Sequence, residues 1–372
     1  MDIYASTLSP ALDIAVGCYL LVVAVLSIIG NLMVIIIAFK RSSRLKPPEL
    51  LSVNLAVSDL GAALTMYPLS VASAWSHHWI GGDATCIYYG LAGFLFGLAS
   101  IMNLTVLAMV RFIVSMNLQS MRDRISWKQA KILCAWTWLY ALIWALFPIV
   151  GWGQYGPEPF GVSCSLAWGQ MKHKGFSFVI SIFSLNLALP SFIITCCYFG
   201  ISIKLYLVYK NYTGGSIPVP NYVKLQQRLL IVSDSGLACI IIVVELPVIF
   251  LSFSQFLFQI AVLVTFGFLG CWFPYGMVSL WSIFNESSAI PPEVSLLPCM
   301  FAKSSTVYNP MIYYIFSKNF QRELKELQMR CLGFYFCKSN SAKEDITFIS
   351  KLDRRSNTAA LSQRCLETTD LG

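Results

Sequence analysis

Residues 294–316 read VSLLPCMFAKSSTVYNPMIYYIF, an apolar run of 23 residues with one basic side chain, Lys303, near its middle. About 20 apolar residues are enough to cross the hydrocarbon core of a bilayer as an α-helix. Lys303 lies about nine residues into the run, which is roughly 14 Å along a helix that rises 1.5 Å per residue. At that depth its ammonium group cannot easily extend to the membrane surface. The stretch therefore predicts a membrane-spanning helix that carries a buried amine.

The composition of the whole chain is that of a membrane protein. Of its 372 residues, 57% are hydrophobic and only 12% are charged, and the mean hydropathy is +0.67. A soluble domain has about 25% charged residues, and a disordered chain combines low hydrophobicity with high net charge, so both classes are excluded. Seven further apolar runs are long enough to span: 14–39, 50–74, 85–110, 132–150, 176–209, 229–256 and 259–284.

The positions of the basic residues predict how these helices are oriented, because cytoplasmic connections of membrane proteins are enriched in Lys and Arg. Of the 26 basic residues, only Lys172, Lys174 and Lys303 lie outside the first, third and fifth connections and the tail. We therefore expect a multi-pass protein of the plasma membrane, with an extracellular N-terminus at 1–13 and a cytoplasmic tail at 336–372.

The number of apolar runs conflicts with this orientation. The chain must cross the membrane an even number of times between the fifth connection and the tail, yet three runs lie there. We expect 232–259 to be the anomalous segment, because it carries Asp234 and Glu245 without a basic partner, which is costly in lipid. Its ends can be encoded by GTAAGT and TTTCAG, so a retained intron is one interpretation. A re-entrant or lipid-facing insertion is the other.

A short amphipathic helix is predicted after the bundle, at 317–335. Apolar residues recur there at helical spacing from Phe320 to Leu327, with basic residues between them. This pattern is typical of a helix that lies on the membrane surface. Cys331 and Cys337 follow close to the membrane and are candidates for palmitoylation, with free thiols as the alternative.

Two ionisable groups inside the predicted helices are candidates for function, since such groups are expensive in a membrane. A desolvated lysine such as Lys303 can form a Schiff base with an aldehyde. A lysine that lines a polar cavity and is paired across helices is the alternative, and the chemistry alone does not separate the two. For Asp59 we expect a buried network with Asn31 and Asn309, in a structural or switching role rather than in catalysis.

The cysteines and histidines indicate a disulfide and no metal site. Cys86 and Cys164 both fall on the predicted outer side, an oxidising compartment, so we expect them to be joined. The 12 cysteines show no spacing typical of metal ligands. For His77 and His78, which precede Trp79, a structural role at the interface is expected before metal binding. Neither a metal nor a nucleic acid is predicted as a partner.

Several motifs together resemble the rhodopsin class of G-protein-coupled receptors, over about residues 10–335 apart from the insertion. They are Gly30-Asn31, Leu55 with Asp59, Trp138, Pro190 with Tyr198, Cys271-Trp272-Phe273-Pro274 and Asn309-Pro310-Met311-Ile312-Tyr313. Within this class the chain is similar to the opsins, because Lys303 lies six positions before Asn309, where opsins attach retinal. The surrounding residues look most like the non-visual neuropsin group. The resemblance implies an all-α protein: a seven-transmembrane helix bundle with an amphipathic eighth helix.

The resemblance also implies a light-sensing receptor rather than an enzyme. Retinal would be bound to Lys303 through a Schiff base, and its isomerisation by light would move helix six and activate a heterotrimeric G protein. A protonated Schiff base in an apolar pocket needs a compensating carboxylate. Vertebrate visual opsins place it where this chain has Tyr89, a neutral phenol. Glu158, six residues before Cys164, matches the other counterion position of opsins.

The remaining site residues follow from the same resemblance. Trp272 and Tyr275 are expected to line the retinal pocket together with Tyr89. A conformational switch is expected from Arg111, Asp59, Asn309, Pro310 and Tyr313. The chain departs from the family at Val110-Arg111-Phe112, where an acidic residue normally precedes the arginine. This leaves two alternatives open: a retinal photoisomerase with weak or no signalling, and a chemoreceptor of the same fold.

Overall fold

The computed structural model describes residues 2–116, 125–171, 175–213, 253–284, 291–316 and 320–329. The chain divides into two compact units, Met1–Ser317 and Lys318–Gly372. In the second unit, residues 320–329 are helical, within the predicted amphipathic helix. Cys331, Cys337 and the tail at 336–372 lie outside the described residues.

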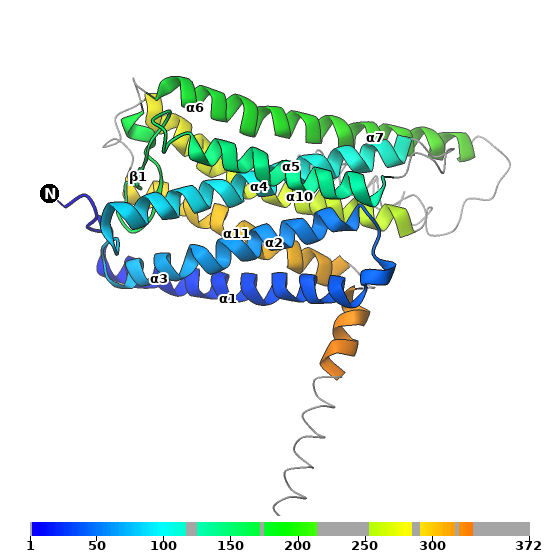
Figure 1. Ribbon diagram of the computed structural model, residues 1–372, viewed down its shortest axis with the longest axis horizontal. Coiled ribbons are helices and arrows are strands. Elements are labelled where there is room, and N and C mark those ends of the chain that lie inside the picture. Colours follow the sequence, from blue (N-terminus) through cyan, green and yellow to red (C-terminus); the bar gives the residue numbers. More distant parts are fainter. Residues whose placement is uncertain are drawn as a thin grey trace, which may run out of the picture. The chain divides into compact units, whose positions relative to one another are not determined.

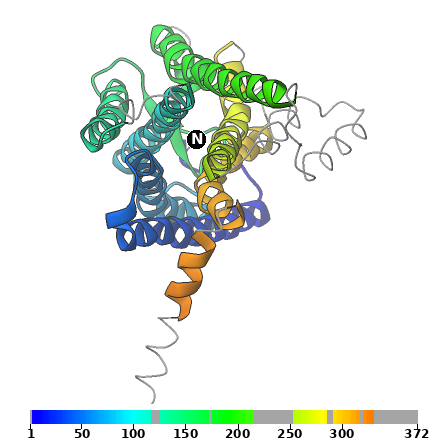
Figure 2. The same cartoon turned by 90° about the vertical axis from the view of Figure 1, so that its right-hand side faces the viewer.

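The first unit is a bundle of membrane-length helices. It consists of α1 (Pro10–Lys40), α2 (Glu49–Thr65), α3 (Tyr67–Trp75), α4 (Gly82–Met116), α5 (Trp127–Leu146), α6 (Phe176–Ile182), the π-helix η4 (Phe183–Ala188), α7 (Leu189–Thr213), α10 (Phe253–Phe284) and α11 (Pro292–Phe316). The pair α2–α3 and the trio α6–η4–α7 each form one span. Within the described residues this gives seven spans, which Figure 2 shows arranged in a ring.

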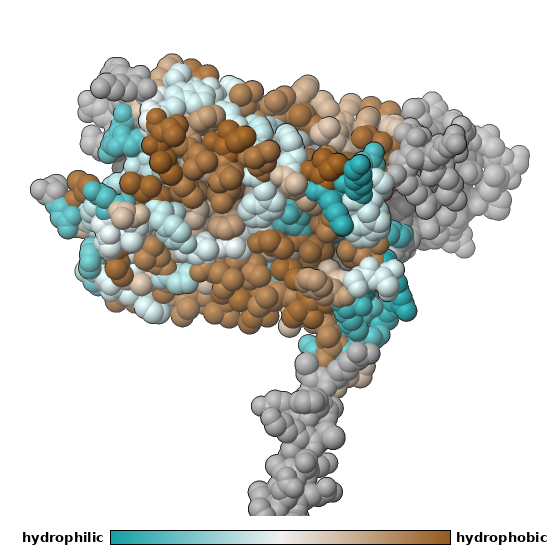
Figure 3. All heavy atoms as spheres, viewed as in Figure 1, coloured by the Kyte–Doolittle hydropathy of each residue, from teal (hydrophilic) through white to brown (hydrophobic). Residues whose placement is uncertain are grey.

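Length and hydropathy explain why these helices can cross a membrane. The spans from α1 through α7 are all apolar and long enough. Helices α10 and α11 contain 32 and 25 residues, more than the roughly 20 that a bilayer requires. Figure 3 shows the matching surface, with hydrophobic side chains over the middle of the visible face and hydrophilic ones gathered toward its ends. The predicted seven-helix membrane bundle is confirmed.

Successive spans run in opposite directions, and α10 begins at the same end of the bundle as α7 ends (Figure 1). The described helices therefore alternate as the placement of the basic residues predicted. Of the predicted insertion, residues 232–252 lie outside the described residues. Residues 253–259 form the first turns of α10 and continue without a break into residue 260. The intron interpretation stays a prediction.

Local sequence explains where the spans begin and bend. Ser9 accepts a hydrogen bond from the Leu12 amide and caps α1, and Pro10 occupies its first position, so the helix starts earlier than the apolar run. The second span is interrupted at Met66, next to Pro68. In the fifth span the π-helix η4 lies directly before Pro190, whose ring removes a backbone donor.

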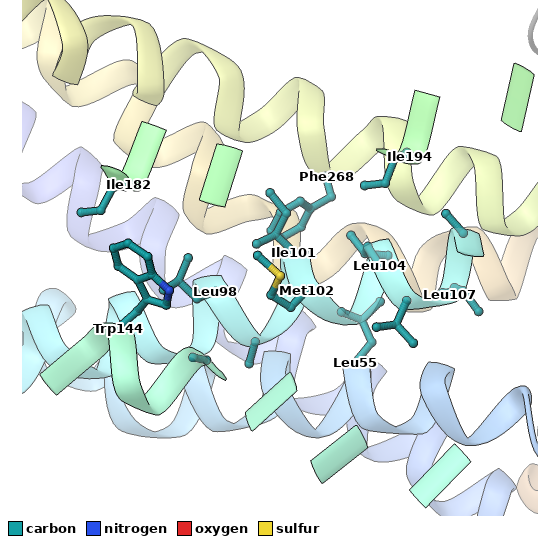
Figure 4. Close-up of a cluster of buried hydrophobic side chains, with 14 of the residues drawn as sticks. Leu55, Leu98, Ile101, Met102, Leu104, Leu107, Trp144, Ile182, Ile194 and Phe268 are labelled. Atoms are coloured by element: carbon teal, nitrogen blue, oxygen red, sulfur yellow. The ribbon is translucent and has the colours of Figure 1, made fainter. Parts of the chain in front are cut away.

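Helix α4 is the centre of the core. Its buried side chains, including Leu98, Ile101 and Leu104, pack against Leu55 of α2 and Phe268 of α10 (Figure 4). A buried polar network adds to these apolar contacts. Asn54, Asn103 and Trp138 are linked across α2, α4 and α5 by hydrogen bonds of 2.9 Å each. Because every polar group in this chain of bonds has a partner, the network fixes how the three helices are placed.

A hairpin covers the end of the bundle at which α1 begins. Strands β1 (Tyr155–Pro157) and β2 (Cys164–Leu166) pair antiparallel, and Cys164 is joined to Cys86 of α4 by a disulfide with Cα atoms 5.3 Å apart. The predicted disulfide is therefore present. It holds the hairpin against α4, and this places Glu158 and the residues before Cys164 above the interior of the bundle.

Candidate functional site

A cavity lies beneath the hairpin, bounded by α2, α3, α4, α10 and α11. Most of its lining is apolar or aromatic, and includes Met66, Phe94, Phe96, Phe268 and Trp272. Polar groups gather where the hairpin meets α11, and include Lys303, Glu158, Ser163 and Tyr89. The cavity thus suits a largely apolar ligand with a polar or reactive end beneath the hairpin.

Lys303 presents its amine at the polar end of the cavity. Its Nζ donates a hydrogen bond of 3.0 Å to the hydroxyl of Ser163, and it lies 5.4 Å from the centre of the Tyr89 ring. In the described part of the chain no carboxylate oxygen lies within 4.0 Å of Nζ. The partner of the amine is therefore a loop hydroxyl and an aromatic face. The ring belongs to Tyr89 on α4, so the amine also has a contact across helices.

Glu158 lines the same cavity but is bonded to other groups. The hydroxyl of Tyr275 donates a hydrogen bond of 2.7 Å to its Oε1, and the Glu158 amide donates one of 2.8 Å to the Ser163 carbonyl. The carboxylate is buried, and this burial raises its pKa above the ordinary value for glutamate, against smaller opposing effects of Ser165, Tyr275 and Lys303. A nearby positive charge is what would stabilise it in its ionised form.

The three aromatic residues predicted for the pocket all line the cavity. Tyr89 is fully buried beneath Lys303, and its hydroxyl is hydrogen-bonded to Ser70. Tyr275 connects Glu158 to Trp168 of the loop, whose indole donates a bond of 3.2 Å to the Tyr275 hydroxyl. Trp272 lies deeper and donates to Ser305 at 3.2 Å, which ties α10 to α11.

The buried carboxylate of Asp59 belongs to a different network, on the inner side of the cavity. Asn309 donates a hydrogen bond of 2.6 Å to its Oδ2, and Ser100 donates one of 3.4 Å to Oδ1. The prediction that Asn31 bonds to Asp59 is wrong. Its side-chain amide instead bonds the backbone carbonyls of Ser27 and Thr306, at 2.9 and 3.0 Å, because it lies on α1 beside α11 rather than facing α2.

Arg111 of the predicted switch is partly buried, near the far end of α4. Its Nε has no hydrogen-bond partner, and no described carboxylate lies within 4.0 Å of it. Its electrostatic neighbours include the hydroxyls of Tyr198 and Tyr313. Pro310 lies inside α11, one residue after Asn309. The structure therefore brings Asp59 and Asn309 together, and places Arg111 near Tyr198, Tyr313 and, more weakly, Glu49.

Sequence reasoning missed several residues at the polar end. Ser163, the hydrogen-bond partner of Lys303, lies in a loop with no motif of its own. Cys299 precedes Lys303 by one helical turn, is buried, and interacts with both Lys303 and Ser163. Its spacing of four residues from Lys303 on a predicted helix was a usable signal. Tyr67 also escaped notice; it donates a 2.6 Å bond to the Lys303 carbonyl.

The histidines have a structural contact. Nδ1 of His77 lies 3.0 Å from Oδ2 of the buried Asp13, which also accepts a bond from Ser6. This ties the N-terminal segment to the connection after α3. Across the described ranges no group of three or more His, Cys, Asp or Glu side chains could hold a metal ion.

Comparison with known proteins places the chain in a family. Residues 30–313 match the family model of the seven-transmembrane receptors of the rhodopsin family. The chain is 34% identical to Opsin-5 of Mus musculus, over 86% of this chain and 78% of that protein. It is 29% identical to the visual pigment-like receptor peropsin of Homo sapiens, over 93% and 91%. The crystal structure of squid rhodopsin superposes with a TM-score of 0.70 at 26% identity, covering 87% of each chain.

These matches agree with the geometry of the bundle and extend along nearly its whole length. They bear out the resemblance drawn from the Cys271-Trp272-Phe273-Pro274 and Asn309-Pro310 motifs and from Lys303. The chain belongs to the rhodopsin family of seven-transmembrane receptors, and within it to the opsins.

Proposed function

We propose that the protein is a light-sensing receptor of the plasma membrane, with its N-terminus outside, in which retinal is attached to Lys303 through a Schiff base. In this proposal, light activates a heterotrimeric G protein at the cytoplasmic end. The observation that carries it is the position of the Lys303 amine, beside Ser163 and Glu158, in the lining of a largely apolar and aromatic cavity. An aldehyde with a long hydrocarbon body fits such a site.

The lining of the cavity suits the shape of retinal. Helix α4 lines the cavity with Gly90, Gly93 and Gly97 between its larger residues, so its backbone is approached closely at these positions. A methyl group added at Gly97 would come within 3.2 Å of the Trp272 ring, tighter than an ordinary contact. Trp272, Phe268 and Phe94 complete a flat aromatic channel suited to a conjugated chain.

The residues at the polar end have distinct tasks in this proposal. Ser163 holds the Lys303 amine at 3.0 Å and orients it toward the cavity. Glu158 supplies the compensating negative charge for the protonated Schiff-base nitrogen, and Tyr275 holds its carboxylate in place. The disulfide between Cys86 and Cys164 fixes the loop that carries both Ser163 and Glu158. The closed hairpin excludes water from the nitrogen.

The proposed route to the cytoplasmic end runs through α10. Retinal, when bound, supplies the light-driven change of shape. Trp272 lies at the floor of the cavity against Gly97, and its bond to Ser305 couples α10 to α11. Pro274 lies inside α10 two residues later, where the missing backbone donor permits a bend. A displaced Trp272 would therefore turn the part of α10 that lies toward the G protein.

The direct test is light-dependent nucleotide exchange by a purified G protein, measured with the full-length chain reconstituted with retinal. We expect exchange to accelerate on illumination, and to stay at the basal rate without retinal. Illumination that isomerises retinal without any change in exchange would favour the photoisomerase alternative. Two observations favour that alternative. The Nε of Arg111 has no hydrogen-bond partner, and the residue before it is the apolar Val110.

A larger side chain at Gly97, where α4 lines the cavity, is expected to hinder retinal binding. Gly97→Val places two methyl groups against Trp272, and overpacking of this kind costs about 1–3 kcal/mol. We therefore expect pigment yield at limiting retinal to fall about tenfold, since 1.4 kcal/mol is a factor of ten. The measurement is the absorption of the purified pigment.

The matched control for this variant is Gly270→Val on α10, where an added side chain meets no atom within 4 Å. Its pigment yield should equal that of the wild type. Thermal unfolding without retinal shows whether Gly97→Val is folded, and Gly97→Ala provides a milder change. Normal pigment in Gly97→Val would mean that retinal does not lie along α4.

A further inference from the structure

The described part of α4 ends at Met116, and its last turn contains no basic residue. The last four carbonyl groups of an α-helix have no partner within the helix, and they form the negative end of its dipole. A basic residue in the last turn commonly compensates, but α4 has none there. The residue before Arg111 is the apolar, buried Val110, so the neighbouring position in the helix supplies no carboxylate to restrain the arginine.

Lys204 of α7 supplies this charge from the neighbouring span. Its Nζ donates hydrogen bonds to the Ser115 carbonyl at 2.5 Å and to the Met116 carbonyl at 2.7 Å. These are the last two residues of α4. A single ammonium group therefore caps the helix that carries Arg111 and joins it to α7.

The packing one turn away brings the two helices close enough for this contact. Gly200 lies four residues before Lys204 on α7, and a methyl group added there would be 2.6 Å from the ring of Phe112. Phe112 thus packs directly on the backbone of α7. Because Phe112 follows Arg111 in the sequence, the junction of Gly200, Phe112 and Lys204 sets where α4 presents the arginine.

We propose that Lys204 is a positioning residue that restrains the cytoplasmic end of α4 in the resting receptor, where the apolar Val110 precedes Arg111. The proposal rests on the proposed function, because the restraint matters only if this face activates a G protein. When the two hydrogen bonds from Lys204 are broken, the last turn of α4 unwinds. Arg111 can then bind a partner.

The test compares Lys204→Ala with Lys204→Arg in the full-length chain, without light. Loss of the contact should raise hydrogen exchange of the amides in the last turn of α4 about two- to fivefold, the size expected for a charge at a helix terminus. Basal nucleotide exchange by the G protein should rise by a similar factor. Arginine retains donors for both carbonyls and should restore both values. Lys128→Ala, on the exposed first turn of α5, is the control and should change neither.

Two readouts separate this proposal from the function on which it rests. Unchanged hydrogen exchange in Lys204→Ala, or a basal rate that does not rise although the wild type activates the G protein, overturns the role of Lys204. Loss of both basal and light-driven exchange also overturns it, since that pattern means general instability. If no variant, wild type included, ever activates a G protein, the proposed function fails, and the restraint of α4 is then decided by hydrogen exchange alone.

Discussion

Replacing Lys303 by alanine is expected to abolish the pigment completely. The amine is the only group at the polar end of the cavity, among the described residues, that can form an imine with an aldehyde. The variant incubated with retinal should show no absorption band beyond that of free retinal. Light-dependent nucleotide exchange should disappear with it. The measurement is an absorption spectrum of the purified protein after excess retinal has been removed.

The control for this experiment is the stability of the ligand-free variant. In the described structure the Lys303 amine is bonded to the Ser163 hydroxyl and has no carboxylate within 4.0 Å, so its removal relieves the cost of a poorly compensated buried charge. Lys303→Ala should therefore melt at the same temperature as the wild type or higher. A pigment of normal yield in a folded variant would show that retinal is held elsewhere.

Glu158→Gln is expected to have the second largest effect. With retinal bound, the Lys303 nitrogen carries a positive charge that Glu158 compensates. Removing one partner of a buried ion pair costs about 3–5 kcal/mol. At 1.36 kcal/mol per pH unit this is a factor of at least about 100 in proton binding. The pigment should therefore lose its proton near neutral pH, and its absorption band should move to shorter wavelength.

The matched control for the counterion is Tyr89→Phe. Tyr89 also lies against the amine, 5.4 Å from ring centre to Nζ, but its phenol carries no charge. The tyrosine variant should keep a protonated pigment at neutral pH. If Tyr89→Phe lost the proton while Glu158→Gln kept it, the counterion would lie at the helix-three position after all.

The melting temperature of the ligand-free protein gives a second test of Glu158. Here glutamine is expected to stabilise the protein relative to glutamate as the pH rises. Burial raises the pKa of this carboxyl, so the folded state holds its proton at a pH where the unfolded chain has released it. As the pH rises through this raised pKa, the wild type loses that stabilisation, whereas glutamine does not titrate. Without retinal, the melting temperature of Glu158→Gln relative to wild type should therefore increase with pH across this range.

The sequence predicted the architecture because bilayer physics imposes simple rules. Each span needs a long apolar run, and basic residues stay on the cytoplasmic side, so seven spans and their directions could be inferred. The interruption of the second span at Met66, between α2 and α3, was not predicted, because Pro68 can begin a new helical segment as readily as it can end one. Which part of 232–259 belongs to the bundle could not be inferred either, because 253–259 contain no helix-breaking residue before the helix that they extend.

The candidate site was predicted where it depends on positions along one helix. Lys303 and Asn309 share α11, so their spacing carried the information. Contacts across elements were harder. Asn31 was assigned to Asp59, but the rotation of α1 against α11 directs it to Thr306. Ser163 reaches Lys303 only because the disulfide brings a loop residue 140 positions away over the cavity. Such contacts depend on the tertiary packing of the helices, which spacing does not encode.

Reduction of the reconstituted protein with borohydride, followed by peptide mass spectrometry, tests the attachment of retinal most directly. The account predicts a retinyl group on the peptide that contains Lys303, in a one-to-one ratio with protein that shows the absorption band. A reduced protein without any retinyl adduct, or with the adduct on another lysine such as Lys204 or Lys128, would contradict it.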